Sequence, residues 1–226
     1  MKTIKQFINN YKHGFWILAY MIFYMLGFYI LENAGHRHYH VLHSWLDDQI
    51  PFCEYFIIPY LLWFAYLVIG ICWFVFKEKD KREYYQLVSV LALGMTIFLI
   101  VSCIWPNRQD LRPTVFARDN IFTLLVQRLY ATDTPTNILP SIHVFNSLAL
   151  FYAINGSPQL RGKKILRAFT GVLTVLIILS TMFLKQHSVV DVSMGIVMSG
   201  ALQIFCERLF QNDAEAYSKE KLRRIY

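Results

Sequence analysis

Long runs of apolar residues dominate the chain and predict its architecture. Six runs of about 18 residues or more are separated by polar or charged segments. They cover Gly14–Leu31, Tyr55–Phe76, Leu87–Trp105, Ile138–Asn155, Ile165–Leu184 and Ser188–Phe205. Because a helix of about 20 apolar residues spans a bilayer, the pattern predicts an all-α integral membrane protein, a bundle of six transmembrane helices. The fourth and sixth runs are the weakest, since each carries polar residues near its start.

The composition agrees with a membrane protein. Hydrophobic residues make up 56% of the 226 residues and charged residues 16%, against about 25% charged in an ordinary soluble domain. This shortage of charge excludes a disordered chain and disfavours a water-soluble globule. The four cysteines fall singly, which indicates neither a disulfide framework nor a thiolate metal site. We expect one membrane domain, residues 1–226, with its first run kept in the mature protein.

Lysine and arginine are distributed unevenly between alternate connections. Sixteen lie in the N-terminal segment, the second and fourth connections and the C-terminal tail, whereas six lie in the other connections. Because cytoplasmic segments carry the excess, both termini are predicted in the cytoplasm of a multi-pass plasma membrane protein. The net charge of +7 is then mostly a topology signal, and no basic face with interleaved aromatics indicates a nucleic-acid partner.

The two long connections on the outer side differ from the short, charged cytoplasmic loops. Residues 32–54 mix four histidines with Trp45, Leu46 and Phe52, which suits an interfacial segment, as helix or loop. Residues 106–137 keep four arginines among aliphatic and aromatic side chains, so we expect an ordered, functional segment. The region that carries candidate chemistry runs from residue 106 to residue 191.

His187 and Asp191 stand four residues apart at the start of the sixth run, so a helix places them on one face. Asp191 is the one acid clearly within an apolar run, where an unpaired carboxylate costs roughly 2.5–3.5 kcal/mol at mid-bilayer. Pairing with the imidazole would fix the ring tautomer and leave its other nitrogen as a base or nucleophile. A structural polar pair, or a capping box of Ser188 and Asp191, is the alternative.

The sequence Pro140-Ser141-Ile142-His143 opens the fourth run. Proline suits a first helical turn, and Asn137 upstream is a candidate cap. The unpaired N–H groups of a helix start and the Ser141 hydroxyl form a candidate phosphate site, and His143 could deliver a proton to a leaving oxygen. A capped helix with an interfacial histidine explains the same residues without catalysis.

Arg112, followed by Pro113 in the long outer segment, offers a planar, permanently charged fork of donors that suits a phosphate. Taken alone, such an arginine is usually a solvated or lipid-facing charge. The charge count nevertheless puts all the candidate groups on one outer side, namely Arg112, Ser141, His143, Lys185, His187 and Asp191. Two histidines, a carboxylate and two or three cations at a membrane surface fit phosphoryl transfer through a covalent histidine.

A histidine cluster in the first outer segment is a competing metal site. His36, His38, His40 and His43, with Asp47 next, carry the donor types that bind zinc. Alternate spacing would gather these side chains on a strand, whereas we expect interfacial helix or loop here. Histidines that contact lipid headgroups are therefore the favoured interpretation, and no metal site is predicted.

The order Arg-Pro at 112–113, Pro-Ser-x-His at 140–143 and His-x-x-x-Asp at 187–191 resembles the type 2 phosphatidic acid phosphatase and vanadium haloperoxidase superfamily, membrane branch. The resemblance implies that His187 attacks phosphorus to form a phosphohistidine, oriented by Asp191. It implies that His143 protonates the leaving alcohol and then activates water. Arg112, Ser141 and backbone N–H groups would hold the phosphoryl oxygens, and neither a metal ion nor another cofactor is needed.

Two cations of the family's motifs are replaced in this chain. Trp105 stands seven residues before Arg112, where the family has a lysine, and Thr181 stands where its third motif has an arginine. Arg108 and Lys185 are the candidate substitutes for binding the substrate phosphate.

Other departures resemble a transferase branch of the family, the inositol phosphorylceramide and sphingomyelin synthases. They are a cation shortly before the third-motif histidine, Ile142 in place of a glycine, and the segment Leu46–Phe52. The leading hypothesis is an outward-facing membrane lipid phosphatase, a phosphoric monoester hydrolase whose partners are a lipid phosphate monoester or diphosphate and the membrane lipids. The alternatives are a lipid phosphotransferase with the same phosphohistidine chemistry and a catalytically inactive lipid-binding scaffold.

Overall fold

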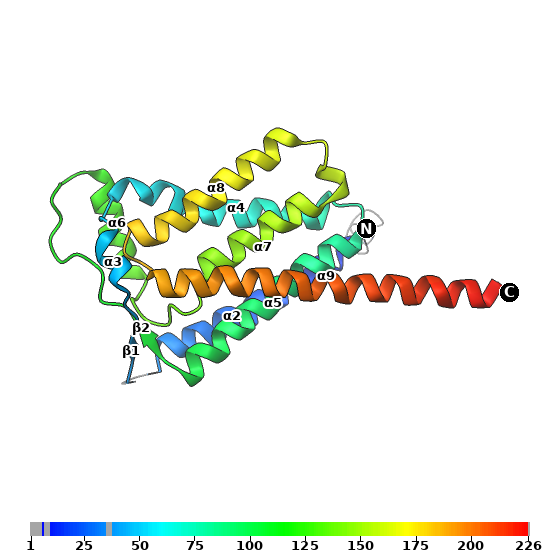
Figure 1. Ribbon diagram of the computed structural model, residues 1–226, viewed down its shortest axis with the longest axis horizontal. Coiled ribbons are helices and arrows are strands. Elements are labelled where there is room, and N and C mark those ends of the chain that lie inside the picture. The colour runs from blue at the N-terminus through cyan, green and yellow to red at the C-terminus, as the bar shows by residue number, and fades with distance from the viewer. Residues whose placement is uncertain (1–5, 7–9, 35–37, 226) are drawn as a thin grey trace.

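A computed structural model describes residue 6, residues 10–34 and residues 38–225, with the side chains of the last helix described through residue 211. The helices are α2 (Gly14–Glu32), α3 (Trp45–Gln49), α4 (Ile57–Phe76), α5 (Lys81–Ile104), α6 (Ile121–Thr132), α7 (Ile142–Gly156), α8 (Lys164–Phe183) and α9 (Val189–Ile225). Short elements complete this part of the chain: the 3-10 helices η1 (Glu54–Phe56) and η2 (Pro158–Leu160), and the strands β1 (His40–Val41) and β2 (Asn107–Arg108). The long helices form a bundle, with α3, α6, β1 and β2 gathered at one end (Figure 1). We call this end the loop end.

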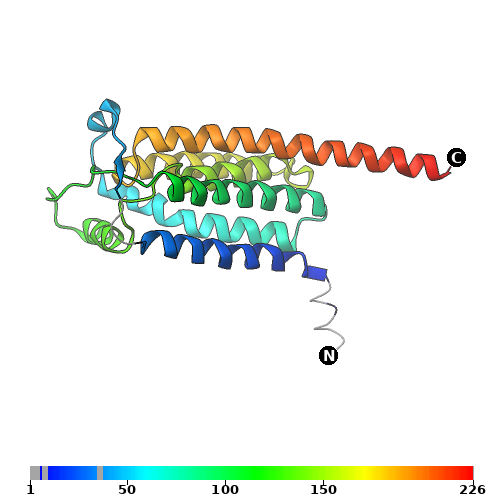
Figure 2. The ribbon, with the colours of Figure 1, turned by 90° about the horizontal axis from the view of Figure 1, so that it is seen from below.

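Five of the described helices are long and apolar enough to cross a membrane. The spans are Gly14–Glu32, Glu54–Phe76, Lys81–Ile104, Lys164–Phe183 and Val189–Gln211. These helices are consistent with the predicted all-α membrane protein. The sixth run, expected to end at Phe205, continues as the helix α9, which projects beyond the bundle toward its C-terminus (Figure 2).

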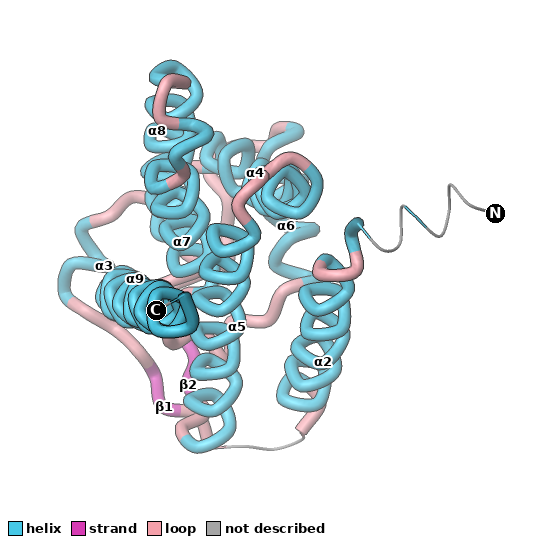
Figure 3. The backbone as a smooth tube through the Cα atoms, turned by 90° about the vertical axis from the view of Figure 1, so that its right-hand side faces the viewer, coloured by secondary structure: helices cyan, strands magenta, loops and turns pink. Residues whose placement is uncertain are grey.

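The predicted fourth span corresponds to α7, which has 15 residues and is not among those five helices. Helix α7 packs against α4, α5, α8 and α9, and its residues Val144, Phe145, Ala149 and Leu150 are fully buried. By contrast α2 lies at the edge of the bundle, against α5 (Figure 3). Helix α7 is therefore the buried helix at the centre of the bundle.

Glycines allow the neighbouring helices to approach α7 closely. A Cβ atom on Gly94 of α5 would lie 2.0 Å from the ring of Phe145. A Cβ atom on Gly195 of α9 would lie 2.9 Å from the backbone oxygen of Ser141. Both distances are shorter than van der Waals contact, so a side chain at either position would force the helices apart.

The start of α7 corrects two expectations. The helix begins at Ile142 with Ser141 as its N-cap, so Pro140 precedes the first turn and Asn137 is not the cap. Asn137 has a left-handed backbone, with φ of 54°. Residues 138–141 leave the helix because the buried Oδ1 of Asn107 accepts hydrogen bonds from the N–H groups of residues 138 and 139, at 2.8 and 3.0 Å.

The first outer segment contains a strand, where we had expected helix or loop. Strand β1 pairs in parallel with β2, and His40 lies opposite Asn107. The N–H of His40 donates to the carbonyl of Pro106 at 2.9 Å, and that of Leu42 donates to Arg108 at 2.8 Å. The second outer segment holds β2 and α6, a helix that begins where Asn120 caps the N–H groups of the next turn.

The turn between α8 and α9 is a Schellman motif. Helix α8 ends at Phe183, and Lys185 follows with a left-handed φ of 52°. The N–H of Gln186 donates to the carbonyl of Thr181 at 2.9 Å, and the N–H of Lys185 donates to that of Met182 at 3.0 Å. Glycine is usual at this position, so other contacts must hold the lysine there.

Three long-range contacts hold Lys185 in this turn. Its ammonium group donates to the carbonyl of Asp47 at 2.6 Å and also to the carbonyl of Ile50. Its own carbonyl accepts from the side chain of Gln109 at 2.9 Å. Partial burial lowers the pKa of Lys185, while nearby carboxylates oppose that shift. The turn before α9 is therefore tied to both outer segments.

The carboxylate of Asp47 caps the start of α9. It is 2% exposed and accepts from the hydroxyl of Ser188 at 2.6 Å and from the N–H of Val189 at 2.7 Å. It also accepts from the N–H of Ser44, at 2.7 Å, within its own short helix α3. The Ser188 hydroxyl also accepts from the N–H of Val190 at 3.2 Å, as the expected capping box of Ser188 and Asp191 requires, so Asp47 adds a distant acceptor to a local cap.

We predict that Gly94→Val destabilises the protein by about 1–3 kcal/mol, because the new side chain would overlap the Phe145 ring in a packed core. Thermal unfolding of the detergent-solubilised protein would measure the effect. Gly200→Ala is the matched control, since a Cβ atom there meets nothing within 4 Å. Equal unfolding temperatures for the two variants would contradict the close approach of α5 to α7.

We predict that Asp47→Ala lowers the free energy of unfolding by about 1–3 kcal/mol and loosens the first turn of α9, because buried donors lose their acceptor. Asp48→Ala is the control, since the Asp48 side chain is 60% exposed. Hydrogen exchange of the amides of residues 188–191 would report the change. Protection that stays the same in Asp47→Ala would mean that Asp47 does not cap this helix.

Candidate active site

Two histidines and an aspartate meet where α7 and α9 begin. Nδ1 of His187 is hydrogen-bonded to Oδ2 of Asp191, and Nε2 of His187 lies 3.2 Å from Nδ1 of His143. His187 stands in the turn before α9 rather than within the helix, yet the expected four-residue contact forms. Asp191 is fully buried, and its Oδ1 has no partner among the described residues.

This network assigns the protons of the two imidazoles. A carboxylate accepts, so the proton of His187 lies on Nδ1 and its Nε2 carries a lone pair. His143 must then donate its Nδ1–H to that lone pair. The arrangement presents one nitrogen that can attack and, beside it, a second imidazole that can release a proton when it is protonated on both ring nitrogens.

Aromatic side chains of α4 hold the ring of His143 in place. The ring centroid of Trp63 lies 4.3 Å from that of His143, and the centroid of Tyr60 lies 4.8 Å away. Tyr60 is 1% exposed, so it offers a rigid wall. The hydroxyl of Tyr60 donates to Oδ2 of Asp133 at 3.3 Å.

Arg112 reaches the site through the residue next to His187. Its guanidinium donates to the side-chain oxygen of Gln186, to the carbonyl of Asp133 at 2.8 Å and to that of Tyr130 at 3.3 Å. It also stacks over the Tyr130 ring, 4.5 Å from the centroid. Burial lowers the pKa of Arg112 from its usual value, and its Nε has no partner among the described residues.

Gln186 and Asp133 are site residues that the sequence analysis did not single out. Both line the same cavity as the two histidines. Gln186 is 2% exposed, and its Nε2 has no partner in the part of the chain that the structure describes. Burial raises the pKa of the Asp133 carboxyl, while His187 and Arg112 oppose that shift. In the sequence, Gln186 could have been noticed because it precedes His187, and Asp133 because it is an acid directly after α6.

The other three predicted phosphate-binding residues make contacts of their own. Ser141 is fully buried, and its hydroxyl accepts from the N–H of Val144 at 3.5 Å. Lys185 binds the two carbonyls of the first outer segment described above. Arg108 donates to Asp110 at 3.1 Å, in an ion pair whose side chains are both about half exposed. Within the described residues, the hydrogen bonds of Arg108 and Lys185 go to other groups than the histidine pair, so the structure does not bring these two cations to it.

A cavity of about 410 Å³ opens beside the histidine pair. Its polar wall includes His143, His187, Asp133, Gln186 and Asn137, from α7 and the turns at the loop end. Its apolar wall consists of side chains of α2, α4, α5 and α7, namely Tyr24, Met25, Phe28, Trp63, Phe64, Phe98 and Ile142. The cavity is therefore amphipathic, with its ionisable groups at one side.

The histidine cluster considered for zinc lies apart from these residues. His43 pairs with Asp48 at 2.9 Å, and that hydrogen bond raises the pKa of His43. The rings of His38 and His40 lie 5.7 Å apart, and His36 lies outside the described residues. Across residues 10–34 and 38–211, no three histidine, cysteine, aspartate or glutamate side chains are grouped as a metal site requires.

Three comparisons with known proteins bear on this arrangement. No curated protein matches the chain, and no solved structure matches it. The model of the PAP2 superfamily matches residues 86–215. The matched region includes the Arg-Pro, Pro-Ser-x-His and His-x-x-x-Asp motifs. Because the match covers more than half of the chain, this protein belongs to the PAP2 superfamily, and that membership supports phosphatase- or phosphotransferase-type chemistry on lipid phosphates.

Proposed function

We propose that this protein is a membrane lipid phosphatase that hydrolyses a lipid phosphate monoester or diphosphate through a phosphohistidine. The observation that carries the proposal is the hydrogen-bonded series from Asp191 through His187 to His143 beside an amphipathic cavity. An enzyme that takes a phosphate from a lipid needs an apolar wall for the chains and polar groups at the reacting end. The cavity offers both.

In the first step, Nε2 of His187 forms a bond to phosphorus, and the bond from phosphorus to the alcohol oxygen breaks. His143 acts here as an imidazolium, protonated on both ring nitrogens, and it passes one proton to that leaving oxygen and becomes neutral. Asp191 keeps its hydrogen bond to Nδ1 and stabilises the positive ring that results. An in-line displacement puts the leaving oxygen on the far side of phosphorus from Nε2, so substrate entry must replace the hydrogen bond between the two histidines.

In the second step, His143 takes a proton from water as the water oxygen bonds to phosphorus. The bond between phosphorus and Nε2 then breaks, which releases phosphate and restores the lone pair of His187. The proposed donors to the phosphoryl group are Gln186, which lines the cavity beside His187, and Arg112, which donates to the side chain of Gln186. The Nε2 group of Gln186 and the Nε group of Arg112 are both unpaired in the described structure and can bind phosphoryl oxygens. We keep three further residues as proposed phosphate ligands, namely Ser141, Lys185 and Arg108. Each would have to give up its present hydrogen bonds to bind a phosphoryl oxygen.

We further propose six spans, with α7 as the buried sixth, both termini in the cytoplasm and the active site on the extracytoplasmic side. Helix α2 begins, and helix α9 ends, on the side of the bundle opposite the loop end, which supports the even number of crossings (Figure 1). The excess of lysine and arginine in the segments at the ends of the chain and in the second and fourth connections supports their cytoplasmic location.

We expect His187→Ala to abolish phosphate release from lipid phosphates, because no nucleophile would remain. Purified protein in detergent with EDTA would be assayed against phosphatidate, phosphatidylglycerophosphate and a polyprenyl diphosphate, with His43→Ala as the matched histidine control. Turnover should vanish in His187→Ala and persist in His43→Ala and in EDTA. Turnover that survives in His187→Ala would overturn the mechanism, and loss of turnover in EDTA would revive a metal site.

One observation favours a second candidate function, a phosphotransferase in which a lipid hydroxyl replaces water. Asp133 and Asn137 place hydrogen-bond acceptors in the cavity wall. An ionised phosphate group also has only acceptors, so it cannot donate a hydrogen bond to them. Oδ1 of the buried Asn137 has no hydrogen-bond partner among the described residues. The Asp133 carboxylate, which accepts from Tyr60 through Oδ2, lines the same cavity. The amide of Asn137 cannot be reversed, because its nitrogen donates to the carboxylate of Glu32 at 2.8 Å. A hydroxyl group of an acceptor or headgroup would supply the missing donor.

The products separate the two functions. The protein would be given a labelled phospholipid and a lipid alcohol, and free phosphate and new phospholipid would be measured. If the protein is a transferase, new phospholipid forms, and Asp133→Asn lowers its yield about tenfold by removing a charged acceptor, while Asp110→Asn does not. Free phosphate as the only product, unaffected by Asp133→Asn, would exclude the transferase. Absence of both products from the folded protein would leave the scaffold function.

A further inference from the structure

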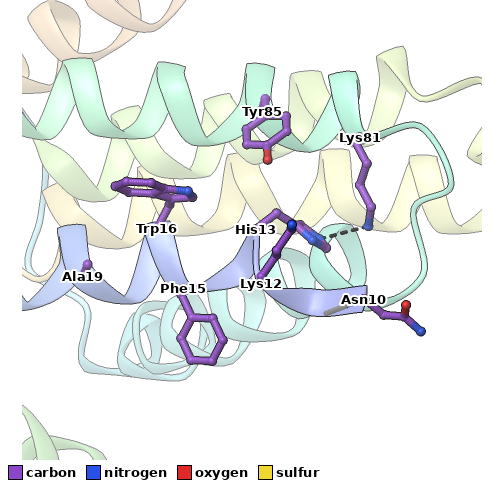
Figure 4. Close-up of a pocket in the computed structure, with 8 residues that line it drawn as sticks. All are labelled: Asn10, Lys12, His13, Phe15, Trp16, Ala19, Lys81 and Tyr85. Carbon is purple, nitrogen blue, oxygen red and sulfur yellow. Dashed lines mark hydrogen bonds between the residues drawn. The ribbon is translucent and has the colours of Figure 1, made fainter. Parts of the chain in front are cut away.

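A second cavity lies at the opposite end of the bundle, where α2 and α5 begin. Its volume is about 610 Å³. The side chains of Lys12, His13 and Lys81 reach it from two segments about 70 residues apart in sequence, with Trp16 and Tyr85 beside them (Figure 4). Helix α2 runs from this end to Glu32, which contacts residues 134–137 at the loop end. The cavity is therefore separate from the histidine pair.

Cationic groups gather in this cavity without an acidic partner. Nζ of Lys81 lies 2.9 Å from Nε2 of His13, and the side chain of Lys12 extends beside the same ring (Figure 4). Neither lysine forms an ion pair with any described carboxylate. Among the acids near Lys81 in sequence, Glu78 accepts from Ser157 at 2.7 Å and Asp80 caps the N-terminus of α5, while Glu83 forms no ion pair with either lysine. Two ammonium groups that share a cavity repel each other unless an anion lies between them.

The hydrogen-bond partners of His13 also favour an anion beside Lys81. Its Nε2 lies within bonding distance of the Val75 carbonyl, at 3.1 Å, as well as of the Lys81 ammonium. The carbonyl requires a donor, whereas the ammonium requires an acceptor, and one ring nitrogen cannot be both. One of these contacts is therefore unsatisfied. An anion that accepted from Lys81 would free Nε2 of His13 to donate to Val75.

The walls of the cavity indicate what carries the anion. Trp16 is 70% exposed and Tyr85 is 40% exposed, next to the charged groups at the ends of two helices that are long enough to span a membrane. Tryptophan and tyrosine favour the level of the lipid headgroups, and lysine at that level binds anionic lipids. A phospholipid could place its phosphate between the ammonium groups and its chains along the apolar surface of α2.

We propose that Lys12, His13 and Lys81 form a binding site for a phosphate group, carried by an anionic phospholipid and distinct from the proposed catalytic site. The site would anchor this end of the bundle by bridging α2 to α5. It does not depend on the proposed phosphatase activity, because none of its residues lies at the histidine pair.

The test is lipid binding by the full chain in detergent, followed by native mass spectrometry with phosphatidylglycerol and with phosphatidylcholine. Lys12→Gln/Lys81→Gln should bind phosphatidylglycerol about thirtyfold more weakly, since each lysine near anionic headgroups contributes roughly fivefold. Lys163→Gln/Lys164→Gln is the charge-matched control, because both side chains are exposed elsewhere. Lys12→Arg/Lys81→Arg keeps both charges and tests folding, and it should retain most of the binding.

The outcomes distinguish the source of the phosphate. Loss that is confined to the Lys12/Lys81 glutamine pair, with no displacement by millimolar inorganic phosphate, supports a phospholipid headgroup. If millimolar inorganic phosphate displaces the bound phosphatidylglycerol, the site binds free phosphate, and the lipid assignment is overturned. Equal binding by both glutamine pairs, or equal affinity for phosphatidylcholine, would overturn the site itself.

Discussion

The contact between the first turns of α7 and α9 is the one on which the candidate site depends. The N–H of Ser141 donates to the carbonyl of Asp191 at 3.1 Å, so the two helix starts are joined by their backbones. Gly195 permits this approach, since a Cβ atom there would lie 2.9 Å from the carbonyl oxygen of Ser141. With the backbones this close, the side chains of His143 and His187 need only short reaches to meet. The geometry of the pair is thus set by packing as much as by the histidines themselves.

The outer segments then hold these helix starts in register. Asp47 caps α9 from a helix more than 130 residues earlier in the chain, and Asn107 binds the segment before α7 through two backbone N–H groups. Lys185 connects both outer segments to the turn before α9, because its ammonium donates to the Asp47 carbonyl and its own carbonyl accepts from Gln109. Lys185, which the sequence analysis offered as a substitute for a missing motif cation, thereby stabilises a left-handed turn. Positive charge at the histidine pair comes instead through Arg112, which orients Gln186.

Local patterns in the sequence predicted the parts of this structure that short-range physics determines. Apolar run length gave the long helices, and the four-residue spacing predicted the contact of His187 with Asp191. The sequence did not reveal the cap from Asp47 or the role of Lys185, because each depends on a partner distant in the chain. The boundary of α7 was misplaced for the same reason: Asn107 removes residues 138–141 from a run that looks continuous. Asp133 was missed because its position beside Tyr60 depends on how α6 packs against α4.

The polar groups at the loop end of the bundle are mostly paired with one another. At the loop end, carboxylates, amides and carbonyls from distant segments bind one another, and few donors or acceptors are left unpaired. Those that are left among the described residues include Gln186 and Asn137, which line the cavity, and Arg112 and Asp191, which hydrogen-bond to the cavity residues Gln186 and His187. An unpaired buried amide costs about 1–3 kcal/mol, and such a cost persists where a ligand removes it in the working state. The strongly connected turns and the few unpaired groups therefore fit the proposed function together, since the turns fix the positions from which the unpaired groups would bind the substrate.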